Sequence, residues 1–329
     1  MQLGFGISTC REGIAYAPGF ASPADIVRLS RVAADAGYTS LWGNQHLITQ
    51  NAVAATASGV PNFYDPLMIM ANVAGQVPGM QLVFGTLVAP LHHPLLLAKQ
   101  LATLDQINGG NVIAGLGIGT YVEETTMLAR PGSPRRHRGR TLSELIQALH
   151  ALFEQESASF HGTEFEFDDV GSFPKPVGTL PIYTSGDSDL GLDRAAELAD
   201  GWILASRSPA QVVVKREQMA RALTKHGRAE TELPLAVQTW VCLEGGGRSA
   251  RSRLVESQHF RRQVTFTGKS EDELIAEFEE RNILGSAAAA VEHVEALAAA
   301  GTDQVALIFL GDAVDDVVDD CEAVAAALR

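Results

Sequence analysis

The feature that most constrains the fold of this chain is a regular alternation of short apolar segments with longer amphipathic ones. Each short segment is rich in β-branched and aromatic residues and predicts a strand, whereas each longer segment repeats apolar residues at helical spacing. Strands that alternate with helices pair in parallel, because each crossover helix returns the chain to the same end of the sheet. We count eight strands, at residues 3–8, 39–43, 81–88, 111–116, 181–184, 202–205, 235–243 and 304–310.

Helix boundaries support this alternation. Ser22 and Pro23 form an N-cap and first-turn pair, and Gly37 is a typical helix end. Helices are expected at residues 22–37, 66–77, 94–108, 141–153, 190–199, 209–225, 287–300 and 312–328. Eight strands without a linker-like shift in composition favour one (β/α)8 TIM barrel of the α/β class over residues 1–329, rather than two doubly wound domains.

Two stretches break the alternation and are expected to be insertions after strands four and seven. Within residues 157–178, the aromatic-rich part at 160–173 predicts a hairpin. Residues 245–285, here called the 245–285 segment, begin with three glycines and carry Arg248, Arg251, Arg253, Arg261 and Arg262. This arginine-rich and apolar-poor beginning predicts a lid that is ordered by ligand rather than by core burial.

Composition limits the possible partners. The formal charge of −14 argues against nucleic-acid binding, because no basic excess is present to neutralise phosphates. The apolar runs are much shorter than a membrane span, and Met1 leads directly into a strand rather than into a signal peptide, so no membrane partner is expected. Cys10, Cys242 and Cys321 are far apart and odd in number, which predicts reduced thiols in a cytoplasmic protein.

The stretch from residue 180 to residue 204 is the first candidate binding element. A short strand ends there at Ser185, Gly186, Asp187 and Ser188, and a helix follows. Such a turn leaves backbone N–H groups unpaired at the positive end of the helix dipole, which suits a phosphate, and the two serines add hydroxyl donors. An ordinary βα turn with a serine N-cap is the alternative interpretation.

A glycine-rich turn falls on the same predicted face, because the working residues of a barrel lie where its strands end. Gly115, Gly117 and Gly119 do not match a dinucleotide-binding fingerprint, since the third glycine comes one residue early. They predict either a backbone that runs close beside a flat ligand or a tight turn that requires a positive φ.

Histidines and arginines supply the charged candidates. His46 ends the second strand and is a candidate for proton transfer, or else a structural hydrogen-bonding residue. His92 and His93 have no Cys, His or carboxylate cluster at ligand spacing beside them, so no metal site is expected. The basic residues 134–140 are interpreted as a solvated helix start, with anchoring of an anionic cofactor as the alternative.

In chain order, these residues resemble the bacterial luciferase-like flavin monooxygenase family. Residues 39–47 (TSLWGNQHL) are similar to its second strand, 84–106 to its third strand and following helix, and 108–121 to its glycine-rich fourth strand. Arg138 to Glu144 resembles the start of its fourth helix, and residues 181–202 its phosphate-binding turn. The sequence departs from the family at Gln45, which replaces an acid, at Ile118, which replaces an arginine of luciferase, and at Asn111, which replaces an arginine.

The resemblance implies a barrel, commonly dimeric, that binds a deazaflavin or reduced FMN supplied by a separate flavin reductase. By resemblance, His46 matches the active-site histidine, and Ser188 a phosphate-contacting serine with Asp187 beside it in the turn that also contains Ser185 and Gly186. The residues expected along the flavin ring are Thr86, Gly117, Gly119 and Tyr121.

We therefore expect a flavin-dependent monooxygenase that uses reduced FMN and O2 on a small organic substrate, held near Cys10, Tyr16 and the 245–285 segment. The alternatives are a deazaflavin-dependent hydride-transfer oxidoreductase and a non-catalytic flavin-binding paralogue. FMN is favoured because Thr120 stands where some deazaflavin enzymes of the family have a glutamate, while Glu123 and Glu124 lie a helical step further on. A chain at −14 also has few basic groups for the polyanionic tail of a deazaflavin.

Overall fold

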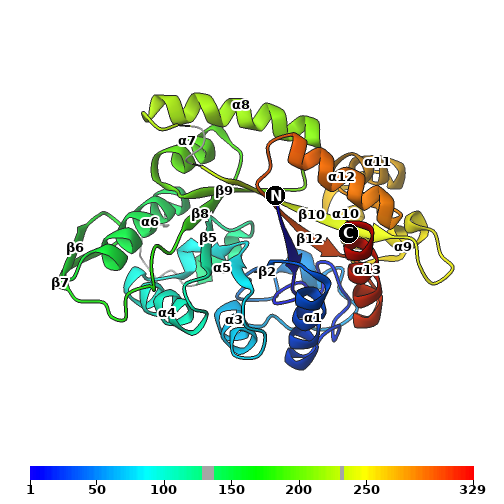
Figure 1. Ribbon diagram of the computed structural model, residues 1–329, viewed down its shortest axis with the longest axis horizontal. Coiled ribbons are helices and arrows are strands. Elements are labelled where there is room, and N and C mark those ends of the chain that lie inside the picture. Colours follow the sequence, from blue (N-terminus) through cyan, green and yellow to red (C-terminus); the bar gives the residue numbers. More distant parts are fainter. Residues whose placement is uncertain (128–136, 230–232) are drawn as a thin grey trace.

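The computed structural model describes residues 1–127, 137–229 and 233–329, and its centre is a closed ring of parallel strands surrounded by helices (Figure 1). The ring closes because β10 pairs in parallel with both β9 and β12, and β12 pairs with β1. The predicted (β/α)8 barrel is therefore confirmed. The strands of the ring are β1 (Gln2–Gly6), β2 (Ser40–Gly43), β3 (Gln81–Phe84), β5 (Val112–Gly117), β8 (Ile182–Ser185), β9 (Gly201–Ala205), β10 (Leu235–Leu243) and β12 (Gln304–Phe309).

The helices lie outside this ring and connect successive strands (Figure 1). Ser22 and Asp25 form a reciprocal capping box at the start of the first helix, and Gly37 ends it with a φ of 98°. The main helices are α1 (Pro23–Ala36), α3 (Pro66–Ala74), α4 (Pro94–Ile107), α6 (Arg138–Glu154), α7 (Asp189–Leu198), α8 (Pro209–Lys225), α12 (Ala287–Ala299) and α13 (Val314–Ala327). In the described parts of the chain, no helix combines the length and apolar character that crossing a membrane requires.

A separate layer of side chains fills the interior of the barrel. It consists of one residue from each of seven strands, namely Trp42, Val83, Ile113, Tyr183, Ile203, Ala236 and Ala306. The Trp42 indole donates a hydrogen bond to Ser40 Oγ at 2.9 Å, and a Cβ atom at Gly4 would collide with its ring. The barrel is thus a packed core, and the room for a ligand lies above this layer, where the strands end.

The predicted third strand is interrupted. It consists of β3 and β4 (Leu87–Val88), with a cis peptide bond between Gly85 and Thr86. A Cβ atom at Gly85 would lie 2.8 Å from the Trp42 ring and 2.9 Å from Gln238 Nε2. Glycine at this position therefore lets the chain pass close to the interior layer and places Thr86 at the barrel mouth.

The hairpin expected at residues 160–173 is present. It consists of β6 (Ala158–His161) and β7 (Glu166–Val170), which pair antiparallel and project from the barrel beside α6 (Figure 1). The buried carboxylate of Glu144 on α6 accepts hydrogen bonds from the backbone N–H groups of Thr163, Glu164 and Phe165, at 3.0, 2.7 and 3.2 Å. This contact fastens the hairpin tip to the barrel.

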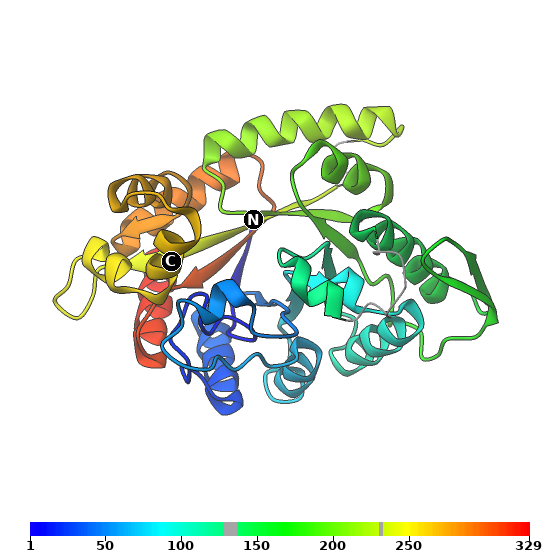
Figure 2. The same ribbon diagram turned by 180° about the vertical axis from the view of Figure 1, so that it is seen from behind.

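The expectation that the 245–285 segment avoids core burial is wrong. It folds into α9 (Ala250–Glu256), α10 (Gln258–Thr267), α11 (Glu271–Arg281) and β11 (Ile283–Gly285), grouped near α13 and far from the β6–β7 hairpin (Figure 2). Six of its apolar side chains join the main core: Leu254, Phe260, Leu274, Ile275, Phe278 and Ile283. A buried ion pair between Arg253 and Asp320, at 3.1 Å, fixes the segment to α13. Its order therefore comes from core packing.

Candidate active site

The carboxyl ends of the strands surround a cavity of about 590 Å3, a volume in the ordinary range for small-molecule sites. Its wall contains residues that lie in or directly after seven of the eight ring strands, from Arg11 after β1 to Gln238 in β10. All the predicted site residues except Tyr121 lie in this wall: His46, Thr86, Gly117, Gly119, Ser185, Gly186, Asp187 and Ser188. Parallel strands bring these residues together because all of them end at the same edge.

The glycine-rich turn forms part of the cavity wall. A Cβ atom at Gly117 would lie 2.7 Å from Thr86 Oγ1 and 2.9 Å from Ser185 Oγ, so glycine leaves both hydroxyl groups open to the cavity. Gly119 has a φ of 77°, and a Cβ atom there would lie 2.7 Å from Val88 Cγ1. The interpretation as a tight turn is therefore confirmed at Gly119, while close approach to a flat ligand at Gly117 stays a prediction.

Residues 185–188, here called the phosphate turn because a phosphate is expected there, connect β8 to α7. Ser188 is the N-cap of α7, and its Oγ accepts the backbone N–H of Gly191 at 3.2 Å. Gly186 has a φ of 113°, and its carbonyl oxygen accepts the indole N–H of Trp202 at 2.9 Å. The turn is held by these contacts while the start of α7 faces the cavity, which suits a phosphate group.

Positive charge surrounds the phosphate turn. The Asp187 carboxylate pairs with Arg207, and it lies 3.7 Å from Lys215 Nζ. Burial acts to raise the pKa of Asp187, but the hydrogen bond and charge of Arg207 outweigh it and lower that pKa. Arg194 on α7 also lines the cavity, and its Nε donates to Ser143 Oγ at 3.0 Å. The wall beside the turn therefore carries a net positive charge in an acidic chain.

The basic stretch at residues 134–140 does not supply this charge within the described residues. Arg138 donates to the Gly119 carbonyl oxygen at 2.6 Å, and Arg140 pairs with Glu164 at 2.7 Å. Arg135 and Arg136 lie outside the described residues. Arg194 and Arg207 were not predicted from the sequence. Their positions could have indicated a role at the cavity, because Arg194 lies on the helix that follows β8 and Arg207 in the loop that follows β9.

His46 is held by a buried carboxylate. Its Nδ1 lies 3.2 Å from Oε2 of Glu124, a residue of the short helix α5 (Val122–Met127), and Oε1 of Glu124 accepts the Leu47 N–H at 2.8 Å. Burial acts to raise the pKa of Glu124, but the hydrogen bond and charge of His46 and the Leu47 amide outweigh it and lower the pKa. The preference for FMN based on Thr120 treats Glu124 as too far along the chain to act at the site. The structure instead places the Glu124 carboxylate next to His46.

Gln45 shapes the wall next to His46. Its Oε1 accepts the Val88 N–H at 2.8 Å and lies 2.8 Å from Nε2 of His92. Burial lowers the pKa of His92 to about 4, so the ring is neutral near pH 7 and donates to Gln45. The described residues contain no group of three or more potential metal ligands.

Three expected residues lie elsewhere. Tyr121 is nearly buried, its ring centroid is 5.5 Å from that of His46, and its hydroxyl group hydrogen-bonds to Arg262 of α10. Cys10 is fully buried, and Tyr16 donates its hydroxyl proton to the Phe309 carbonyl oxygen at 2.7 Å. The Cys10 and Tyr16 side chains therefore belong to the core and do not line the cavity themselves, whereas Arg11, the chain neighbour of Cys10, does.

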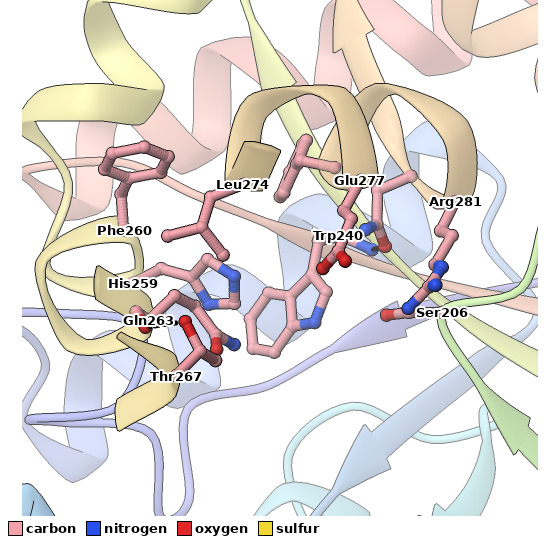
Figure 3. A pocket seen from close by; sticks show the side chains of 11 residues that line it. Ser206, Trp240, His259, Phe260, Gln263, Thr267, Leu274, Glu277 and Arg281 are labelled. Atoms are coloured by element: carbon pink, nitrogen blue, oxygen red, sulfur yellow. Dashed lines mark hydrogen bonds between the residues drawn. The ribbon is translucent and has the colours of Figure 1, made fainter. Parts of the chain in front are cut away.

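A second cavity, of about 270 Å3, lies under α10 and α11 (Figure 3). Trp240 and His259 lie side by side in it, with ring centroids 4.6 Å apart (Figure 3). Ser206 lines this cavity, whereas its chain neighbours Ala205 and Arg207 line the first one. The two cavities are therefore neighbours at the end of β9.

Comparisons with known proteins identify relatives. A family profile described as luciferase-like monooxygenase matches residues 1–326. An FMNH2-dependent dimethylsulfone monooxygenase of Pseudomonas putida is 26% identical over 200 residues, which are 60% of this chain and 54% of that protein. The chain thus spans about half the length of the curated relatives it matches.

Two solved structures share the fold. One is an F420-dependent secondary alcohol dehydrogenase in complex with an F420-acetone adduct, with a TM-score of 0.80 and 17% identity, covering 100% of this chain and 99% of that chain. The other is a monooxygenase from Streptomyces bottropensis, with a TM-score of 0.80 and 18% identity, covering 100% of this chain and 98% of that chain. At these identities the likeness establishes the barrel.

Proposed function

This chain belongs to the luciferase-like monooxygenase family, and we propose that it uses reduced FMN and O2 to oxidise a small organic substrate. In such a reaction one oxygen atom of O2 enters the substrate and the other leaves as water, while the bound reduced flavin supplies two electrons. The observation that carries the proposal is a single cavity whose wall contains the phosphate turn with Arg194 and Arg207 beside it and, after another strand, His46.

The residues in the cavity fit FMN. The start of α7, Ser188 and Arg194 would hold the phosphate, because they offer an N-terminal helix dipole, a hydroxyl group and a guanidinium. Gly117, with the hydroxyl groups of Thr86 and Ser185 on either side of it, would hold the flat ring, since any larger side chain at this glycine would fill the space between them.

His46 would handle protons. Its Nδ1 faces the ionised Glu124, which leaves Nε2 as the ring nitrogen available to the cavity. A carboxylate on one ring nitrogen fixes the orientation of the imidazole. The Tyr121 ring packs edge-on against His46 and, with Arg262, covers it from the side of α10, which helps to exclude water from the reacting groups.

A deazaflavin remains the second candidate. The His46–Glu124 pair favours it, because hydride transfer from an alcohol needs a nearby proton acceptor. Three arginines of the 245–285 segment count against it, because Arg248, Arg251 and Arg253 each pair with a carboxylate of the chain and are not free for a polyanionic tail.

Anaerobic equilibrium binding of reduced FMN and reduced F420 tests the cofactor, and O2 uptake with FMN, NADH and a flavin reductase tests the activity. We expect tighter binding of FMN and substrate oxidation that depends on O2. Tighter binding of F420 with hydride transfer in the absence of O2 would contradict the proposal, and flavin binding without turnover on any substrate would favour a non-catalytic paralogue. The homodimer and the cytoplasmic location stay predictions, which sedimentation and fractionation test.

A further inference from the structure

Arg11 marks a second positively charged position in the cavity, outside the phosphate turn. It follows β1, whereas the phosphate turn follows β8, and these strands are four steps apart in either direction around the ring of eight. The guanidinium itself reaches Trp240 of β10, two strands from β8. Arg194 and Arg207 already line the cavity beside the phosphate turn, so Arg11 is available to a second ligand group.

The guanidinium of Arg11 is buried, and no carboxylate among the described residues pairs with it. The residue is 5% exposed, and its Nη2 has no hydrogen-bond partner among the described residues. Its Nε makes one long hydrogen bond, 3.4 Å, to the Ile7 carbonyl oxygen, and its Cζ lies 5.4 Å from the centre of the Trp240 ring. A buried charge without a partner is costly, and an anionic ligand removes this cost.

A second arginine adds to the positive potential there. Arg262 of α10 is 8% exposed, and its Nε is also without a partner in the described chain. Its Nη2 donates a hydrogen bond to the Tyr121 hydroxyl group. His259 packs against the Trp240 ring that Arg11 contacts, with ring centroids 4.6 Å apart. Burial first, and then the charges of Arg262 and Arg11, lower the pKa of His259 to about 3. The histidine is therefore neutral, and no carboxylate of the described residues pairs with either arginine.

We propose that Arg11 binds the anionic head group of the substrate, a carboxylate or sulfonate on a short carbon chain. The inference rests on the proposed function, because it assigns the substrate class of the same cavity. A guanidinium presents two parallel N–H donors that match two oxygen atoms of such a group. Val88, Ile203 and Leu204 give the same cavity an apolar wall for the carbon chain.

Calorimetric titration of the protein saturated with oxidised FMN tests this assignment, because the bound cofactor already occupies the phosphate turn. The probes are hexane-1-sulfonate and hexanoate, compared with the neutral methyl hexyl sulfone and hexanamide. Arg11→Gln is the test variant, Arg11→Lys retains the charge, and Arg31→Gln is the control, since Arg31 is exposed on α1 and bonds Gln76.

We expect the anions to bind the parent protein at least about 10-fold more tightly than the neutral probes. Arg11→Gln should weaken anion binding about 10- to 100-fold, with unchanged affinity for FMN and for the neutral probes. Arg11→Lys should retain part of the affinity, and Arg31→Gln all of it. Equal binding of anions by the parent and Arg11→Gln, or no preference for anions over neutral probes, would overturn the inference.

Two further measurements keep the result unambiguous. Failure of FMN itself to bind would count against the proposed function, and the anion titration is then repeated on flavin-free protein, where Arg11 is still present. Arg11→Met should be at least as stable as the parent in urea, because it removes an uncompensated buried charge. A large loss of stability in Arg11→Met would instead identify Arg11 as a structural residue.

Discussion

Ser188 allows a direct test of the phosphate turn. Ser188→Asp places a carboxylate beside the expected phosphate, and Ser188→Asn is the matched control of the same shape without charge. Aspartate and asparagine are both good N-caps, so either variant should preserve the hydrogen bond to Gly191 that starts α7. Any difference in FMN affinity between the two variants then reports on charge.

The expected magnitude follows from Coulomb's law. Two unit charges about 6 Å apart repel by about 3 kcal/mol at an effective dielectric constant of about 20, and by less than about 1 kcal/mol in water. Ser188 is exposed and Arg194 is close, so the effect should lie between these limits. We therefore expect Ser188→Asp to bind FMN about 10-fold or more weakly than Ser188→Asn.

Calorimetry with FMN and with riboflavin completes the design, because riboflavin has the same ring and no phosphate. The two variants should bind riboflavin equally, and added salt should narrow the difference in their FMN affinity. Equal FMN affinity in Ser188→Asp and Ser188→Asn would refute the phosphate assignment. An equal loss of riboflavin binding would show that the substitution disturbs the cavity as a whole.

Three further predictions concern charged and titratable groups. His46→Ala should lower turnover about 100-fold or more with little change in FMN affinity, measured as O2-dependent substrate oxidation, and wild-type turnover would make His46 structural. Because the pKa of Glu124 is lowered in the folded state, its ionised form stabilises the fold at any pH above the ordinary glutamate pKa of about 4.3. This stabilisation is lost as the pH falls through the lower pKa of the folded state. Glu124→Gln should remove that acid dependence from urea unfolding curves, and an unchanged pH profile would contradict it. Asp320→Asn should destabilise the protein by about 3–5 kcal/mol in urea, because it leaves buried Arg253 unpaired, whereas exposed Asp319→Asn should change little; equal effects would argue against the ion pair.

The sequence predicted those parts of the structure that depend on local pattern. The barrel follows from strand and helix periodicity. Residues 185–188 were recognisable as a strand-to-helix turn because the strand, the turn and the N-cap are adjacent in the chain. The pairing of His46 with Glu124 was not predictable, since 78 positions separate them and α5 is a short helix without an amphipathic pattern. Arg11 has no sequence signal beyond its position after the first strand, at the predicted working face of the barrel. Only the fold shows that it is buried and faces Trp240.

The layer of side chains around Trp42 has a consequence for the order in which ligands bind. It closes the barrel beneath the cavity, so cofactor and substrate must enter by the mouth where the strands end. The flavin ring is expected deepest, beside Gly117, with the substrate above it. Binding should then be sequential and ordered, with the flavin first. In steady-state kinetics, excess substrate should slow the entry of reduced flavin and appear as substrate inhibition that more reduced flavin relieves.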